Sequence, residues 1–214
     1  SVETNGTQSH GIVGRSVGAA LAMGNACVLK PSEIAPISSM VFAEVIHEAG
    51  LPKGVFNLVN GDGAGVGTQL STHPDVDMVS FTGSTRAGIA ITKAAADTLK
   101  KVALELGGKD ANLVFADADD KAVVRGARHC FYNSGQSCNA PTRMLVERGA
   151  YEKAVETAKK VAEETSVGSA HDAGKHIGPV VSKQQWDKIQ DLIQKGIDEG
   201  ARLVAGGTGL PDPQ

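Results

Sequence analysis

Short apolar runs of β type alternate with helical runs along the first half of the chain, and this alternation is what most restricts its fold. Each apolar run ends at a glycine, a proline or a polar turn, and a helical pattern precedes the next one. Such a β-α-β-α order favours a parallel sheet covered by helices, with right-handed crossovers. We expect strands at residues 26–30, 54–59, 77–81 and 101–106. We expect one helix at 37–49, a short second helix that the run 61–67 opens and that ends at about 72, and a third that follows 82–88 and ends at about 99.

A second α/β set follows the double glycine Gly107-Gly108, which is the natural hinge between the two sets. Ser182 followed by Gln185 is a capping-box pattern and marks the start of the last helix. The sequence therefore predicts a two-part α/β chain. In the second part we expect strands at 111–115, 143–147 and 201–204, and helices at 119–133, 151–165 and 182–199.

Composition excludes several classes of protein. The formal net charge is −3, so there is no basic surplus to hold nucleic acid or an anionic membrane. No apolar run approaches the ~20 residues that a membrane span requires. Three cysteines without pairing spacing argue against a disulfide framework and favour a reducing compartment, so we expect a cytoplasmic protein. The six histidines are scattered, and we expect no metal site.

Cys138 and Glu105 lie in two separate loop-forming stretches and suggest covalent chemistry. Cys138 follows glycine, glutamine and serine in a turn, where a thiol is placed for attack, and a carboxylate at a strand end can move protons. The alternatives are a free loop cysteine and a solvated strand residue. Cys27 and Cys130 lie in an apolar strand and a helical run, so both are interpreted as packing residues.

Two further stretches carry groups suited to a nucleotide. Gly83 and Ser84 lie at a helix start, where backbone N–H groups and the dipole favour a pyrophosphate, although an ordinary N-cap explains them equally well. Lys30 and Glu33 follow a strand and can bond the hydroxyls of one ribose, but they also fit an exposed pair on a turn. The glycine run at 61–67 is a weaker phosphate candidate, because it is not G-x-G-x-x-G.

Five motifs in order resemble the aldehyde dehydrogenase superfamily, from about Gly11 to near the last residue. They are GNACVLKPSE (24–33), VSFTGSTRAG (79–88), LELGGK (104–109), GQSC (135–138) and GPVVS (178–182). The resemblance implies a Rossmann-like parallel-sheet cofactor domain at 11–108. It also implies part of an α/β catalytic domain at 109–214, with 1–10 an unmatched N-terminal segment.

The resemblance also implies the reaction, which is oxidation of a small-molecule aldehyde to a carboxylic acid with NAD. Cys138 would be the nucleophile and Glu105 the general base. The implied cofactor contacts are Lys30 and Glu33 at the adenosine ribose, Gly83 and Ser84 at the pyrophosphate, and additionally Ser32 and Leu106.

Two neighbours of the cysteine, Ser137 and Asn139, would line the substrate site. Glu33 would repel a 2′-phosphate, so NAD is favoured over NADP.

The chain departs from the superfamily pattern at two places. The Trp-Asn pair that supplies an oxyanion donor has no match in residues 1–10, where Asn5 is the only asparagine, and the Glu-x-Phe-Gly-Pro motif is absent. The alternatives are therefore a non-catalytic or truncated nucleotide-binding remnant of that fold, or a CoA-acylating or ester-hydrolysing relative. An incomplete sheet leaves an exposed edge, so we expect a homo-oligomer.

Overall fold

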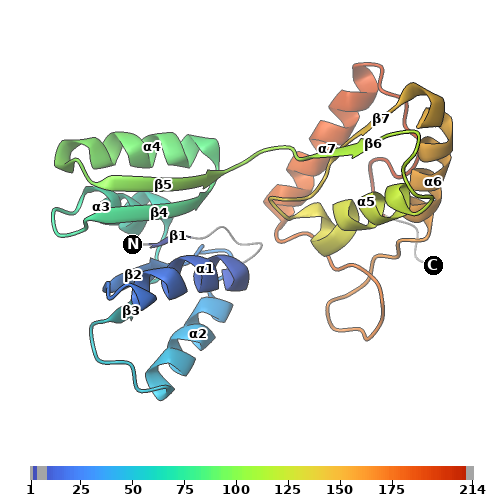
Figure 1. The fold of residues 1–214 in the computed structure, drawn as a ribbon. Helices are drawn as coiled ribbons and strands as arrows, with labels where there is room; N and C mark the ends of the chain where they lie inside the picture. Colours follow the sequence, from blue (N-terminus) through green and yellow to red (C-terminus); the bar gives the residue numbers. More distant parts are fainter. Residues whose placement is uncertain (1, 4–8, 211–214) are drawn as a thin grey trace. The chain divides into compact units, whose positions relative to one another are not determined.

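The computed structural model describes residues 2–3 and 9–210 of the chain, which divides into two compact units, Ser1–Gly107 and Gly108–Gln214 (Figure 1). The division falls at the double glycine. Asn5, the one asparagine in the N-terminal segment that does not match the Trp-Asn pair, lies outside the described residues.

The first unit is built on a five-stranded parallel sheet with the order β3-β2-β1-β4-β5. The chain runs outward from β1 to β3 and then returns to β4 and β5 on the other side, as in doubly wound folds. The strands are β1 (Val2–Glu3), β2 (Cys27–Lys30), β3 (Phe56–Leu58), β4 (Met78–Gly83) and β5 (Lys101–Leu106).

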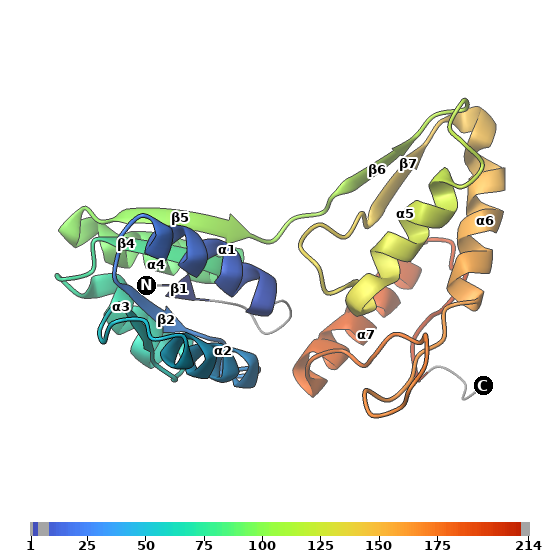
Figure 2. The same ribbon diagram turned by 60° about the horizontal axis from the view of Figure 1, so that its bottom comes forward.

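Helices cover both faces of this sheet. α1 packs beside α2 on one face and α3 beside α4 on the other (Figures 1 and 2). This arrangement follows from right-handed crossovers in a chain that reverses its direction across the sheet. The helices are α1 (Ser9–Ala22), α2 (Ile37–Glu48), α3 (Thr68–Thr72) after a π turn (Gly63–Gly67), and α4 (Thr85–Ala95) before a 3₁₀ turn (Ala96–Thr98).

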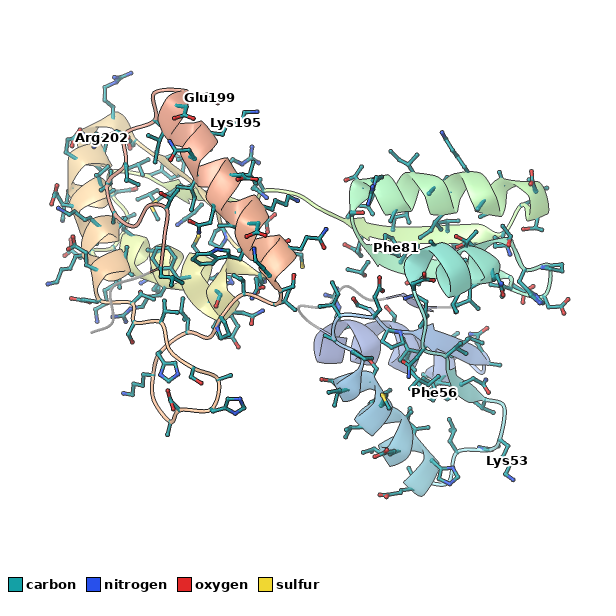
Figure 3. All side chains as sticks on the ribbon, turned by 180° about the vertical axis from the view of Figure 1, so that it is seen from behind. Lys53, Phe56, Phe81, Lys195, Glu199 and Arg202 are labelled. Carbon is teal, nitrogen blue, oxygen red and sulfur yellow. The ribbon has the colours of Figure 1, made fainter. Side chains whose placement is uncertain are left out.

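Each face of the sheet has its own apolar cluster. On one face, Val17 of α1 and Leu29 of β2 are fully buried. Phe42 and Phe56 pack against them, and their two rings meet edge to face with ring centroids 5.8 Å apart. On the other face, Phe81 lies in a cluster with Val79, Ile91, Leu104 and Leu106. Figure 3 labels Phe56 and Phe81. The two clusters hold the strand ends in a fixed order.

The second unit contains a parallel pair, β6 (Ala111–Val114) and β7 (Arg143–Val146), with α5 (Ala122–Phe131) packed on α6 (Tyr151–Glu163). A Cβ on Gly126 would overlap the Asn112 side chain, so α5 approaches β6 closely because that residue is glycine. The remaining elements are α7 (Lys183–Asp198) and two 3₁₀ turns (Tyr132–Gly135 and Arg148–Ala150).

The α/β fold class predicted from the sequence is confirmed, and two local predictions can be followed to single atoms. Gly50 has φ 79° and its N–H bonds the His47 carbonyl, so it ends α2 as expected. Ser182 caps α7, because its hydroxyl accepts a hydrogen bond from the Gln185 N–H at 3.2 Å.

The predicted strand at 201–204 is wrong. No strand is present in that stretch of the described residues, and the Ala201 N–H bonds the Gly196 carbonyl at the end of α7. An apolar run becomes a strand only where a neighbour offers a free edge. β1 and α1 were not predicted at all, although Val17 and Leu21 have the i, i+4 spacing of a helix face.

Two absences hold for the described residues. No helix is long and apolar enough to cross a membrane, and no group of three or more His, Cys, Asp or Glu side chains is placed to hold a metal ion.

Candidate active site

The predicted cofactor residues all lie at one edge of the first unit's sheet. β2 ends at Lys30, β4 at Gly83 and β5 at Leu106, and the strands are parallel, so their carboxyl ends share that edge. Open α/β sheets bind ligands outside this edge, near the point where the strand order reverses. The topology alone therefore brings these residues together.

Lys30 is fully buried at the end of β2. Its ammonium donates to the carbonyls of Pro31 at 2.8 Å and Gly61 at 3.1 Å, and it lies 3.8 Å from the exposed Glu33 carboxylate. A buried charge needs such partners to offset its lost hydration. Ser32 is half-buried and accepts a hydrogen bond from the Ile34 N–H at 3.3 Å. The turn thus holds the Glu33 carboxylate in solvent beside a fixed positive charge.

Ser84 begins α4 as its N-cap, and its hydroxyl accepts from the Ala87 N–H at 3.2 Å. The first turn of α4 contains no acidic residue, so its N–H groups and dipole remain suited to an anion. Gly83 is half-buried, and a Cβ there would lie 2.5 Å from the Phe81 ring. A Cβ on Gly88 would lie 2.7 Å from Leu106, so this glycine lets α4 pack closely on β5.

Glu105 and Leu106 close β5 on opposite faces. In the β4–β5 register Glu105 lies beside Thr82, and Leu106 lies beside Gly83. Leu106 packs in the apolar cluster under α4, whereas Glu105 is exposed and its carboxylate bonds to none of the described residues. A carboxylate without a partner at a strand end is free to accept a proton.

A cavity of about 190 Å³ between α3 and α4 was missed by the sequence reasoning. Small residues line most of it, including Gly63 and Gly67 before α3 and Ala87, Ala90 and Ala94 on α4. The spacing i, i+3, i+7 of the alanines was the available signal. Gly63 and Gly67, which belong to the glycine run at 61–67 named as a weaker phosphate candidate, form part of the cavity wall.

Cys138 lies in the second unit, in a turn closed by the Ala140 N–H donating to the Ser137 carbonyl at 3.1 Å. Cys138 and Asn139 occupy the two central positions and are exposed, while Ser137 is half-buried and Ala140 is buried. Neither the thiol nor the backbone N–H of Cys138 bonds to any described residue. The turn therefore presents a nucleophile together with a free donor.

The other two cysteines are packed, as predicted. Cys27 is 5% exposed in β2, and Cys130 is half-buried in α5. Burial raises the pKa of the Cys27 thiol and also that of the Cys130 thiol, because an apolar environment disfavours the thiolate. Both thiols are thereby less reactive than they would be in water.

Comparison with known proteins adds three findings. The family model described as the aldehyde dehydrogenase family matches residues 9–214. The 3-succinoylsemialdehyde-pyridine dehydrogenase of a Pseudomonas species is 52% identical over 201 residues, which is 94% of this chain and 42% of that protein. The chain thus spans well under half the length of this curated relative.

Two solved structures are similar throughout the matched part. The aldehyde dehydrogenase of Bartonella henselae is 70% identical with a TM-score of 0.86, covering 87% of this chain and 39% of its own. Aldehyde dehydrogenase C from Pseudomonas syringae, a mutant solved with NAD⁺ and octanal, is 46% identical with a TM-score of 0.89. That match covers 92% of this chain and 41% of the other.

Proposed function

The chain belongs to the aldehyde dehydrogenase family, and from this we propose that it takes part in the NAD-dependent oxidation of an aldehyde to a carboxylic acid. The observation that carries the proposal is the Cys138 turn, which combines an exposed thiol with a backbone N–H that bonds to no described residue. Covalent catalysis at a carbonyl needs both a nucleophile and a donor for the oxyanion.

The residues at the sheet edge fit NAD. The capped start of α4, with Gly83 and Ser84, suits the pyrophosphate, and Lys30, Ser32 and Glu33 suit the adenosine ribose. The cavity between α3 and α4, lined mostly by small residues, suits a flat adenine ring, and Leu106 packs against α4 at Gly88. The exposed Glu33 carboxylate disfavours a 2′-phosphate, so NADP fits less well.

In the proposed reaction the Cys138 thiolate attacks the aldehyde carbon and gives a thiohemiacetal. The Cys138 N–H donates to its oxyanion, and Ser137 and Asn139 line the substrate. NAD held at the sheet edge would supply the acceptor for the hydride that leaves that carbon. The product on Cys138 is a thioester, which a water molecule hydrolyses after Glu105 takes its proton. The Glu105 carboxylate is exposed and bonds to none of the described residues, which supports this role over that of a structural ion-pair partner.

Self-association and a cytoplasmic location are part of the same proposal. Three large apolar side chains of the second unit are more than half exposed, which supports burial against another surface. They are Leu113 in β6, Phe115 directly after β6 and Leu145 in β7. All three cysteines are free thiols, which supports a reducing compartment.

The test compares Cys138→Ala with Cys130→Ala in the full chain. We expect Cys138→Ala to lower aldehyde turnover by at least ~10⁴-fold, because a covalent step is removed. NAD binding should persist, and intact mass should show an acyl adduct only when Cys138 is present. If the unaltered chain binds NAD but forms no adduct with any aldehyde tried, the nucleotide-binding remnant is the correct interpretation.

A further inference from the structure

Three consecutive residues just before the cysteine turn have left-handed backbone conformations. Asn133 has φ 52°, Ser134 has φ 57° and Gly135 has φ 73°. Only glycine adopts this region without steric cost, so the two side-chain-bearing residues are strained. Strain of this kind persists only where surrounding contacts enforce it.

Two side chains bond this left-handed run to residues 178–181. The Ser134 hydroxyl donates to the Gly178 carbonyl at 2.6 Å, and the Gln136 side-chain oxygen accepts from the Val181 N–H at 2.9 Å. We call these two bonds the anchor. Each joins residues more than 40 positions apart. The anchored segment continues directly into Ser182, the N-cap of α7, so the anchor connects the turn to a helix.

Gln136 also makes two bonds within the left-handed run itself. Its side-chain nitrogen donates to the Asn133 carbonyl at 3.1 Å, and its backbone N–H donates to the same carbonyl. Cys138 comes two residues later, and the turn closes at Ala140, which is 3% exposed. The Cys138 turn is therefore held at one end by the anchor and at the other by a buried residue.

From this geometry we infer that Ser134 and Gln136 are positioning residues, which orient the Cys138 turn so that its free N–H faces the oxyanion formed at Cys138. The inference rests on the proposed nucleophilic role of Cys138. Without the anchor the strained residues relax toward ordinary backbone conformations and rotate the turn. A displacement of about 1 Å at a reacting group can lower a rate by about 100-fold.

The test compares two reactions of the same thiol. With p-nitrophenyl acetate the thiolate forms a bond to the acyl carbon, an oxyanion develops, and nitrophenolate leaves with the bonding electrons. With iodoacetamide the thiolate displaces iodide and no oxyanion forms. The ratio of the acylation rate to the alkylation rate therefore reports on the oxyanion donor, and common changes in thiol nucleophilicity cancel.

Three variants and one control give the expected pattern. Ser134→Ala and Gln136→Met each remove an anchor bond and should lower the ratio by about tenfold or more. Gln136→Glu keeps an acceptor for the Val181 N–H, so its rate ratio should stay close to that of the unaltered chain. Gln184→Ala, on the exposed start of α7, should leave the ratio unchanged. A ratio in Ser134→Ala and Gln136→Met within about twofold of the unaltered chain would overturn the inference.

Hydrogen exchange separates a local effect from loss of folding. In the anchor variants, peptides covering 133–140 and 178–182 should exchange faster together, while those of α6 keep their protection. Exchange that stays unchanged in both peptides would also overturn the inference. The ester needs neither NAD nor aldehyde. A chain that shows the predicted ratios without oxidising any aldehyde would therefore contradict the proposed function and not the anchor.

Discussion

The two units place their candidate site residues by different means. In the first unit, Lys30, Gly83 and Glu105 stand at the ends of parallel strands, so sheet topology puts them on one edge. In the second unit, Cys138 lies in a turn outside both strands, between the end of α5 and the start of β7, and side-chain bonds to residues 178–181 hold its flank. A cofactor edge can therefore be recognised from topology, whereas the cysteine turn depends on individual hydrogen bonds.

The interiors of the units also differ. Larger side chains, namely Leu29, Phe81 and Ile91, are buried in the first unit. The buried apolar residues described in the second unit are valines and alanines, namely Val114, Ala127, Ala140, Ala154 and Val161. Because burial free energy grows with apolar area, the sheet of the first unit should tolerate large-to-small changes least.

The largest expected effect comes from Leu29→Ala in β2. Leu29 is fully buried, so the change should cost about 2–5 kcal/mol of unfolding free energy. The matched change Leu192→Ala in α7, at a residue 57% exposed, should cost less than about 0.5 kcal/mol.

Urea unfolding can be followed in each unit separately. Hydrogen exchange of residues 27–30 reports on the first unit, and fluorescence of Trp186, the single tryptophan, reports on the second. Equal losses of unfolding free energy for the two leucine changes would refute the proposal that the first unit tolerates large-to-small changes least.

Gly88→Val tests the close packing of α4 on β5. The added Cβ would lie 2.7 Å from the Leu106 side chain, and overpacking typically costs about 1–3 kcal/mol. We expect a lower melting temperature and weaker NAD binding in a titration followed by fluorescence. Gly18→Ala is the control, because nothing lies within 4 Å of its Cβ position in α1. Unchanged NAD affinity in Gly88→Val would mean that this helix does not shape the cofactor edge.

Ser84→Ala and Ser182→Ala remove comparable N-caps, one in each unit. Both hydroxyls accept a backbone hydrogen bond at 3.2 Å, so each loss should cost about 0.5–2 kcal/mol. Thermal denaturation should show similar losses. Only Ser84→Ala should also weaken NAD binding, because only α4 begins at the proposed pyrophosphate site. A similar loss of NAD affinity in Ser182→Ala would contradict that assignment.

The smallest effect concerns pH and α5. Arg125 donates two hydrogen bonds to Asp119 and lowers the pKa of that carboxyl to about 2. A carboxyl whose pKa is lower in the folded state adds stability above its unfolded pKa, and this contribution is lost as pH falls from about 4 to about 2. The protection factors of the α5 peptide, which are exchange rates divided into the intrinsic rate at the same pH, should fall in that range in the unaltered chain. In Asp119→Asn the protection of the α5 peptide should depend less on pH. An identical pH profile in the variant and the unaltered chain would argue against a stabilising Asp119–Arg125 pair.

Periodicity in the sequence predicted most elements to within a few residues, although local contacts decided where they end. The expected helix 119–133 begins only at Ala122, because Asp119 bonds the Lys121 N–H and Arg125 ahead of it. It ends at Phe131, because Asn133 and Ser134 turn left-handed. The β type of 201–204 was a local propensity with no strand beside it among the described residues.

The sequence by itself determined the alternation of strands and helices, the N-caps Ser84 and Ser182, and the packed state of Cys27. These features depend on residues within one or two turns of each other or on the period of the apolar pattern. Only the tertiary structure decided the cavity between α3 and α4, the partners of the buried Lys30 ammonium and the anchor beside Cys138. The cavity, the bond from Lys30 to the Gly61 carbonyl and the anchor all depend on contacts between residues about 20 to 45 positions apart. No local pattern specifies which distant backbone carbonyl or N–H a side chain will meet.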